Sequence, residues 1–480
     1  MSTAGRRIGS TVLALAAAMA LLSDCSAKVA GTAGPLGQLD PGSAGGMPVN
    51  SGASGPRPNV PDATLPVANS DHGEMDRLAV NTLADVDDYW RDQLPKVFGK
   101  QFKPAAKLTS YDSDGVNVRV CGGHEDTAGQ VNAFYCDLDN SVSWDRGVLL
   151  PGLVQSFGPL AVTMVLAHEM GHAVQSQLGP LSGVNNATPS IVLEQQADCY
   201  AGAFMRSVAE DKAKHFQLST GDGLNKVLAT TFFVRDQPGD SFKGKGAHGN
   251  AFDRVFAFQT GFTDGPKRCA KIDVAEINAR ITETAFRDDT DAAQNGNVPI
   301  TTGNIQQIGK TLDTVFAKAG TKPPTLSTAK AAQCSDAKAT SPAAYCPATD
   351  TVSMDLAKLK VLGTHTKKGP GIGDFAAFGE VASRYVLSVQ KKADLPLDGT
   401  NTGLRTACLV GFWGSAMKKG VDDFSLSAGD LDEAVAELLT TNSLIAADVN
   451  GTAAASGFSR VEAFRIGFLQ GADTCTQKFD

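Results

Sequence analysis

Apolar and polar residues alternate in the first third of the chain as they do in β-strands. The alternation runs from Val116 to Val120, and residues 134–136 open a second strand-like run. The segment Asn140–Asp145 is expected to form the edge of this sheet, where an extended peptide could pair with its backbone. The pattern therefore predicts a small sheet in this region.

Two longer apolar segments predict helices directly after these strands. The first begins at Pro159 and ends at Gly179, residue types that suit a helix start and a helix stop. The second opens at Pro189 with Thr188 as its N-cap and runs past Met205. A small sheet followed by helices predicts an α+β fold.

Composition limits the number of domains and the class of partner. A chain of 480 residues is longer than one ordinary core requires, so we expect two or more domains. Hydrophobic residues make up 42% and charged residues 20%, which is typical of globular proteins. The net charge of -8 and the lack of a dense Lys/Arg cluster argue against a nucleic-acid partner.

The N-terminus has the features of an export signal. Arg6 and Arg7 precede an apolar run over residues 8–22, which is too short for an ordinary membrane span. The run ends before Cys25 in a pattern that resembles a bacterial lipobox, although Asp24 departs from it. We expect residues 1–25 to be a signal peptide with lipidation at Cys25, which would place the protein on the outer face of the cell membrane. The alternatives are a secreted protein or an uncleaved anchor.

Two features divide the rest of the chain. Residues 26–75 are rich in Gly, Pro, Ala and Ser without periodicity, which predicts a disordered tether. Beyond them, five short blocks recur in order at an offset near 210; residues 252–269, for example, match residues 458–475. We therefore expect a duplicated domain, with a first copy over residues 76–320 and a second over residues 321–480.

The cysteines follow the same repeat. Apart from Cys25 there are eight, four in each half, and an exported protein can keep disulfides. Four cysteines allow three pairings. We favour Cys121–Cys136 with Cys199–Cys269, and Cys334–Cys346 with Cys408–Cys475. Cysteine-bound metal is less favoured because no Cys-x-x-Cys spacing occurs.

The first predicted helix contains the sequence His-Glu-Met-Gly-His at residues 168–172. His168 and His172 are spaced i and i+4, so both imidazoles lie on one helical face and can bind one zinc ion. Glu169 would then lie beside the open coordination position and activate a zinc-bound water as general base. The competing interpretation is an amphipathic helix with surface histidines.

The second predicted helix offers a third ligand. A catalytic zinc usually has three protein ligands, and Glu194 follows His172 on the next helix. Asp198 lies one turn further along and could accept a hydrogen bond from one histidine and fix its tautomer. One zinc ion per chain is expected, although both carboxylates could instead belong to a solvated stripe.

The two motifs together resemble those of a bacterial neutral zinc metallopeptidase family with gluzincin-type architecture. The similar segments are residues 134–136, 166–175 and 193–202, with His248-Gly249, Arg254 and Phe258 after them. The resemblance covers roughly residues 100–270 and implies zinc, peptide hydrolysis and a pair of ligand-bearing helices below a small sheet. Gln195 stands where the family commonly has Leu, and the resemblance does not extend to the second half.

Two further residues are candidates for stabilising the oxyanion of a tetrahedral intermediate. His248 lies in a Gly-rich stretch before a predicted helix and could reach the site from a loop. Tyr200 is a second candidate, and a surface position is the alternative for His248. In the second half, the positions matching Glu194 and Asp198 are near Gly403 and Ala407, so we expect that copy to lack the ligands.

The sequence therefore predicts an exported, lipid-anchored zinc metallopeptidase that hydrolyses peptide or protein substrates. The alternative is an envelope binding or scaffold lipoprotein with a vestigial or structural zinc site. Structural zinc usually has four protein ligands, and three candidates plus a base favour catalysis. Zinc-dependent hydrolysis of a different amide, such as one in the cell wall, is a third option.

Overall fold

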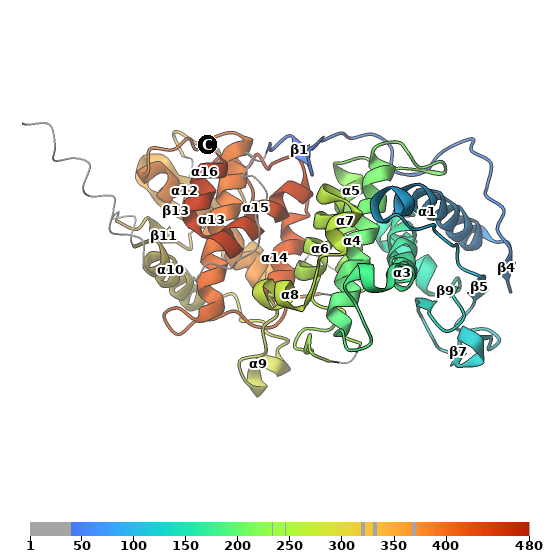
Figure 1. The fold of residues 1–480 in the computed structure, drawn as a ribbon. Helices are drawn as coiled ribbons and strands as arrows, with labels where there is room; N and C mark the ends of the chain where they lie inside the picture. Colours follow the sequence, from blue (N-terminus) through green and yellow to red (C-terminus); the bar gives the residue numbers. More distant parts are fainter. Residues whose placement is uncertain are drawn as a thin grey trace, which may run out of the picture. The chain divides into compact units, whose positions relative to one another are not determined.

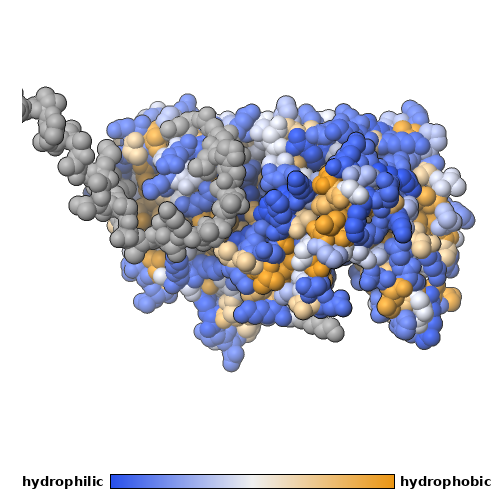
Figure 2. All heavy atoms as spheres, viewed as in Figure 1, coloured by the Kyte–Doolittle hydropathy of each residue, from blue (hydrophilic) through white to orange (hydrophobic). Residues whose placement is uncertain are grey.

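The computed structural model describes residues 40–479 except residues 233, 245, 318–321, 330–333 and 367–370. The predicted signal peptide and the lipidation site Cys25 lie outside the described residues. Within the described part of the chain, no helix combines the length and the apolar character that a membrane span requires. The face drawn in Figure 2 is mainly hydrophilic, with smaller hydrophobic areas.

Helices and short strands together make an α+β fold, as the sequence predicts (Figure 1). The earlier helices are α1 (Glu74–Phe98), α2 (Leu149–Phe157), α3 (Leu160–Leu178), α4 (Ser190–Ala209), α5 (Asp222–Ala229), α6 (Ala251–Asp264), α7 (Pro266–Cys269), α8 (Val274–Arg280), α9 (Asp289–Ala293) and α10 (Thr302–Phe316). The later helices are α11 (Leu356–Leu362), α12 (Asp374–Lys392), α13 (Thr400–Lys419), α14 (Asp430–Leu438), α15 (Gly457–Gln470) and α16 (Ala472–Lys478). The strands are β1 (Ser43–Ala44), β2 (Met47–Pro48), β3 (Gly55–Pro56), β4 (Val67–Ala68), β5 (Lys107–Tyr111), β6 (Arg119–Val120), β7 (Glu125–Asp126), β8 (Ala133–Cys136), β9 (Ser141–Asp145), β10 (Phe216–Gln217), β11 (Thr325–Ser327), β12 (Ala343–Cys346) and β13 (Thr351–Met354).

The sheet nearest the His-Glu-Met-Gly-His helix has the strand order β4-β5-β9-β8. Strand β9 is parallel to β5 and antiparallel to β8, so it pairs on both sides. The prediction that Asn140–Asp145 forms the edge is therefore wrong, and β8 is one of the two edge strands. All five residues of β9 are buried, which fits a central strand. The partner β5 comes from residues 107–111, a pairing that local alternation cannot reveal.

Two local predictions also fail. Within Val116–Val120 only the last two residues form a strand, β6, and Val116 is 87% exposed. Helix α4 begins after Pro189, and no side chain caps its N-terminus. Thr188 instead accepts a hydrogen bond from the backbone N–H of Asn185 at 2.9 Å, within the preceding turn. The hydroxyl of Thr188 therefore contacts the turn before α4 and does not accept a hydrogen bond from the first N–H groups of the helix.

The predicted disordered tether, residues 26–75, is wrong from residue 40 onward. Strand β3 pairs with β10, and β4 adds to the main sheet beside β5. The backbone N–H of Asn50 donates to Thr220 Oγ1 at 2.9 Å. This segment has few apolar residues of its own, but it obtains backbone and side-chain partners from the folded part.

Close helix contacts set the position of α3 against α4 and of α4 against α6. A Cβ added to Gly171 would lie 2.9 Å from Ala197 Cα, and one added to Gly261 would lie 1.7 Å from the carbonyl oxygen of Cys199. Both distances are too short for any larger residue. Gly171 is the glycine of His-Glu-Met-Gly-His, so this residue allows the two predicted ligand helices to lie against one another.

The structure contains the four disulfides that the sequence favours. They join Cys121 to Cys136, Cys199 to Cys269, Cys334 to Cys346 and Cys408 to Cys475. The second ties α4 to α7 and the fourth ties α13 to α16. Bonds that close long loops stabilise a fold mainly by restricting the unfolded chain.

The later residues pack directly against the earlier ones. Their own sheet has the order β11-β13-β12, beside α12. Helix α14 contacts α6, and α15 contacts α5 (Figure 1). Gln259 Nε2 of α6 donates to the carbonyl of Phe458 at 2.8 Å, and Asn225 Oδ1 of α5 accepts from the N–H of Gly457 at 3.0 Å. The boundary near residue 320 stays a prediction.

Candidate metal centre

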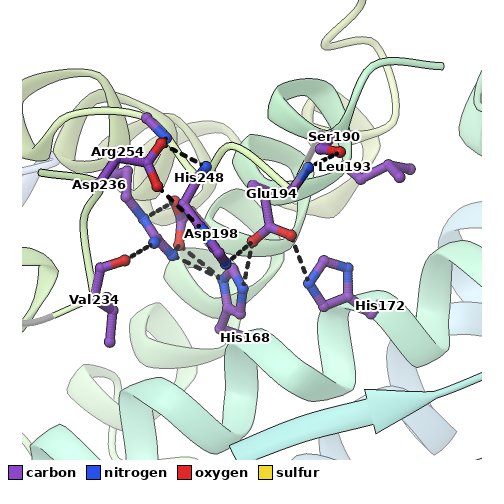
Figure 3. Close-up of polar contacts among 12 residues, drawn as sticks. His168, His172, Ser190, Leu193, Glu194, Asp198, Val234, Asp236, His248 and Arg254 are labelled. Carbon is purple, nitrogen blue, oxygen red and sulfur yellow. Dashed lines mark hydrogen bonds and ion pairs between the residues drawn. The ribbon is translucent and has the colours of Figure 1, made fainter. Parts of the chain in front are cut away.

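Helices α3 and α4 bring the three predicted ligands together (Figure 3). His168 Nε2 lies 3.1 Å from Glu194 Oε2, and His172 Nε2 lies 3.6 Å from Glu194 Oε1. One potential ligand atom from each residue lies within 4.8 Å of the others. The histidines share a face of α3 because they are one helical turn apart, and the close approach at Gly171 brings Glu194 to that face.

Each imidazole is held by its other ring nitrogen. His168 Nδ1 lies 2.8 Å from Asp198 Oδ1, and His172 Nδ1 lies 2.9 Å from Gln175 Oε1. Because carboxylate and amide oxygens accept hydrogen bonds, these contacts favour a proton on Nδ1 and leave the Nε2 lone pairs directed at Glu194. The hydrogen bond predicted from a histidine to Asp198 is thus present. The contact with Gln175 was missed.

A buried arginine fixes Asp198. Arg254 of α6 donates from Nε to Asp198 Oδ2 at 2.9 Å and from Nη2 to Asp198 Oδ1 at 2.8 Å, a two-point contact. The arginine is 1% exposed and also donates to the carbonyl of Val234. From the sequence, Arg254 is expected at the site only through the family resemblance. Its spacing from the motif gives no local signal, since the contact depends on how α6 crosses α4.

The charges around the imidazoles favour a cation between them. Burial opposes protonation of His168, but Asp198 and Glu194 outweigh it and raise its pKa to about 10. Burial also opposes ionisation of Glu194, yet His172 and His168 lower its pKa well below the usual value. Surroundings that hold a proton on these rings can hold a metal ion at Nε2 instead.

The donor set fits zinc. Two imidazole nitrogens and one carboxylate oxygen match the three protein ligands of a catalytic zinc, which keeps a further position open. Among the described residues, the group that contains these histidines includes no fourth His, Cys, Asp or Glu. This group therefore supplies three protein ligands.

Glu169 lies between the predicted metal ligands and strand β8. Its Oε2 accepts a hydrogen bond at 3.0 Å from the backbone N–H of Tyr135 in β8. Burial raises the pKa of Glu169, while the neighbouring His168 and His172 act in the opposite direction. A buried carboxylate with a raised pKa beside a metal group is suited to accept and return a proton.

The loop before α6 brings His248 to the same group. Its Nε2 lies 3.8 Å from Glu194 Oε2, and its Nδ1 lies 3.3 Å from Asp236 Oδ1 (Figure 3). The side chain is 46% exposed, so it faces solvent beside the predicted ligands. Tyr200, the other candidate, is fully buried and packs edge-on against Trp90 at 5.4 Å between ring centroids. It belongs to the core between α1 and α4.

Comparison with known proteins gives the same assignment. Residues 46–272 match the family model described as "Putative neutral zinc metallopeptidase". The Escherichia coli (strain K12) protein named "Uncharacterized protein YpfJ" is 30% identical over 205 residues, which cover 39% of this chain and 68% of that protein. The Mycobacterium tuberculosis (strain ATCC 25618 / H37Rv) protein named "Uncharacterized protein Rv2575" is 30% identical over 218 residues, which cover 41% and 71%. No solved structure matches. The resemblance predicted from the motifs is confirmed, and the chain belongs to the neutral zinc metallopeptidase family.

Proposed function

We propose that this chain is a zinc-dependent peptidase in which His168, His172 and Glu194 hold one zinc ion. The observation that carries the proposal is the convergence of two imidazole Nε2 atoms on one carboxylate while each Nδ1 is fixed by its own acceptor. When bound, zinc polarises the carbonyl of the scissile peptide and lowers the pKa of water. The family implies peptide or protein substrates.

Glu169 acts as the general base and then as the general acid. It takes a proton from the attacking water and passes it to the leaving amine, so one side chain serves both steps. Its hydrogen bond to the N–H of Tyr135 fixes the carboxylate beside β8 and leaves Oε1 for the proton. Asp198 and Gln175 keep the two histidines in one orientation throughout.

His248 stabilises the negative charge that develops on the substrate oxygen. Its Nε2 faces the metal group from the side opposite its contact with Asp236, and nearly half of the side chain is open to solvent. A substrate can therefore reach it without displacing core residues. A positioned donor of this kind contributes about 3–4 kcal/mol to the transition state.

The substrate binds in extended form along β8. This strand is one edge of the sheet, and the N–H of Tyr135 points away from β9 toward Glu169. A peptide lying along this edge would place its backbone next to the proposed base. We thus retain the predicted binding of an extended peptide at a strand edge, but at Ala133–Cys136 rather than at Asn140–Asp145.

The second half is a duplicate that lacks the metal ligands. The register of β8 with β9, from Ala133↔Trp144 to Cys136↔Ser141, recurs 210 residues later as Ala343↔Met354 to Cys346↔Thr351 in β12 and β13. The contact of Gly261 with the Cys199 carbonyl recurs as Gly467 with Cys408, each at 1.7 Å to an added Cβ. Helix α12 contains no histidine.

The protein is exported and held at the outer face of the membrane by lipid on Cys25. The apolar run of residues 8–22 and four disulfides support export. Cell fractionation tests the anchor: the parent chain should sediment with membranes, and a Cys25→Ser variant should not. Equal membrane retention of the variant would contradict lipidation at this residue.

Digestion of an unbiased peptide library tests the proposed activity. Zinc-loaded protein should cleave a subset of peptides, lose cleavage with a chelator and recover it with added Zn²⁺. Cleavage that persists after metal analysis shows no zinc would contradict the proposal. A zinc-loaded chain that cleaves neither the library nor casein would instead favour a binding lipoprotein.

A further inference from the structure

The loop that carries His248 lies in the first half and contacts the second. We define the His248 loop as residues 234–244 and 246–250, which contain no helix or strand. Within the first half, Asp236 Oδ2 accepts from the N–H groups of His248 at 2.8 Å and Gly249 at 2.7 Å. These bonds fix the shape of the end of the loop, and two further contacts hold it within the first half: Arg254 donates to the carbonyl of Val234, and the N–H of Gly246 donates to Ser190 Oγ at 2.9 Å.

A residue of the second half reaches both ends of this loop. Asp432 of α14 lies 2.8 Å from Arg235 Nε as an ion pair, although the N–H is not aimed at the carboxylate. Asp432 Oδ1 also accepts from the N–H of Phe252 at 3.2 Å, in the first turn of α6. Arg235 directly precedes Asp236, and Phe252 follows Asn250, the N-cap of α6. One carboxylate therefore contacts Arg235 near the start of the His248 loop and Phe252 just beyond its end.

The ion pair between Asp432 and Arg235 is largely buried. Only 6% of the Asp432 side chain is exposed and 22% of the Arg235 side chain. Removing one member of a buried charge pair leaves the other without compensation, which costs more than losing a surface pair. The N-terminus of α6 adds a favourable interaction with the carboxylate. Movement of Arg235 would carry Asp236, and with it the imidazole of His248.

We infer that the second half serves the peptidase site as a positioning element, in which Asp432 fixes the loop that presents His248 beside Glu194. The inference rests on the proposed function, because it gives His248 a task in hydrolysis. It assigns a use to the copy that lacks ligands. Asp432 is a positioning residue, since it touches neither the metal ligands nor the substrate edge β8 in any described contact.

A double-mutant cycle in the full, zinc-loaded chain tests the inference. Asp432→Ala should lower kcat by roughly 10–100-fold with KM little changed, because His248 would no longer be held in its position beside Glu194. In a His248→Ala background the same change should cause no further loss. Zinc content should equal that of the parent. Asn225→Ala, which removes a contact between the halves away from the loop, should have the same small effect in both backgrounds.

Further measurements keep the test independent of folding and of activity. If Asp432→Ala does not fold, Arg235→Gln removes the ion pair and leaves the contact with Phe252. Hydrogen exchange should rise in the His248 loop of either variant and stay unchanged in α3 and α4. Unchanged exchange in the loop, or equal loss of kcat with and without His248, would overturn the inference. Raised exchange in a chain without peptidase activity would overturn the proposed function alone.

Discussion

Glu169→Gln is expected to leave zinc bound and to lower peptide hydrolysis by roughly 10²–10⁴-fold. The amide oxygen of Gln can still accept the hydrogen bond from the Tyr135 N–H, so the geometry beside β8 is retained. What the variant cannot do is take a proton from water. Initial rates on a peptide found in the library screen, with zinc measured on the same sample, provide the check.

Glu125→Gln is the matched control for this prediction. Glu125 is exposed in β7, so the same change in charge there should alter neither rate nor zinc content. Turnover by Glu169→Gln equal to that of the parent would rule out Glu169 as the base. Loss of zinc together with activity would show that Glu169 serves the metal site and would leave the base unassigned.

Glu194→Ala should remove zinc and, with it, all measurable hydrolysis. Two imidazoles remain in this variant, which is fewer than the three protein ligands a catalytic zinc requires. The parent should unfold at a higher temperature when Zn²⁺ is added, because a ligand that binds only the folded state stabilises it. This shift should disappear in the variant. Metal analysis after dialysis and thermal unfolding with and without Zn²⁺ measure both effects.

A control separates loss of metal from loss of fold. Glu74→Ala alters an exposed residue at the start of α1 and should keep both zinc and the thermal shift. Glu194→Ala that still binds one zinc per chain would show that another group completes the site. His248 would then be the first residue to examine, because its Nε2 lies 3.8 Å from Glu194.

Interactions that depend on nearby residues could be predicted from the sequence. The spacing of His168 and His172 places both rings on one face of any helix, and Pro159 and Gly179 give that helix its ends. The four disulfides favoured from the repeated order of the cysteines match those in the structure. The family could be recognised because its motifs are compact.

Only the tertiary structure decided the partners that come from distant segments. The edge position of β8 depends on β5 pairing with β9. The folded conformation of residues 40–75 depends on distant partners such as Thr220. Arg254 reaches Asp198, and Asp432 reaches Arg235, through helix crossings that no local periodicity encodes. Short-range spacing fixes which side chains share a face, whereas packing between elements fixes which faces meet.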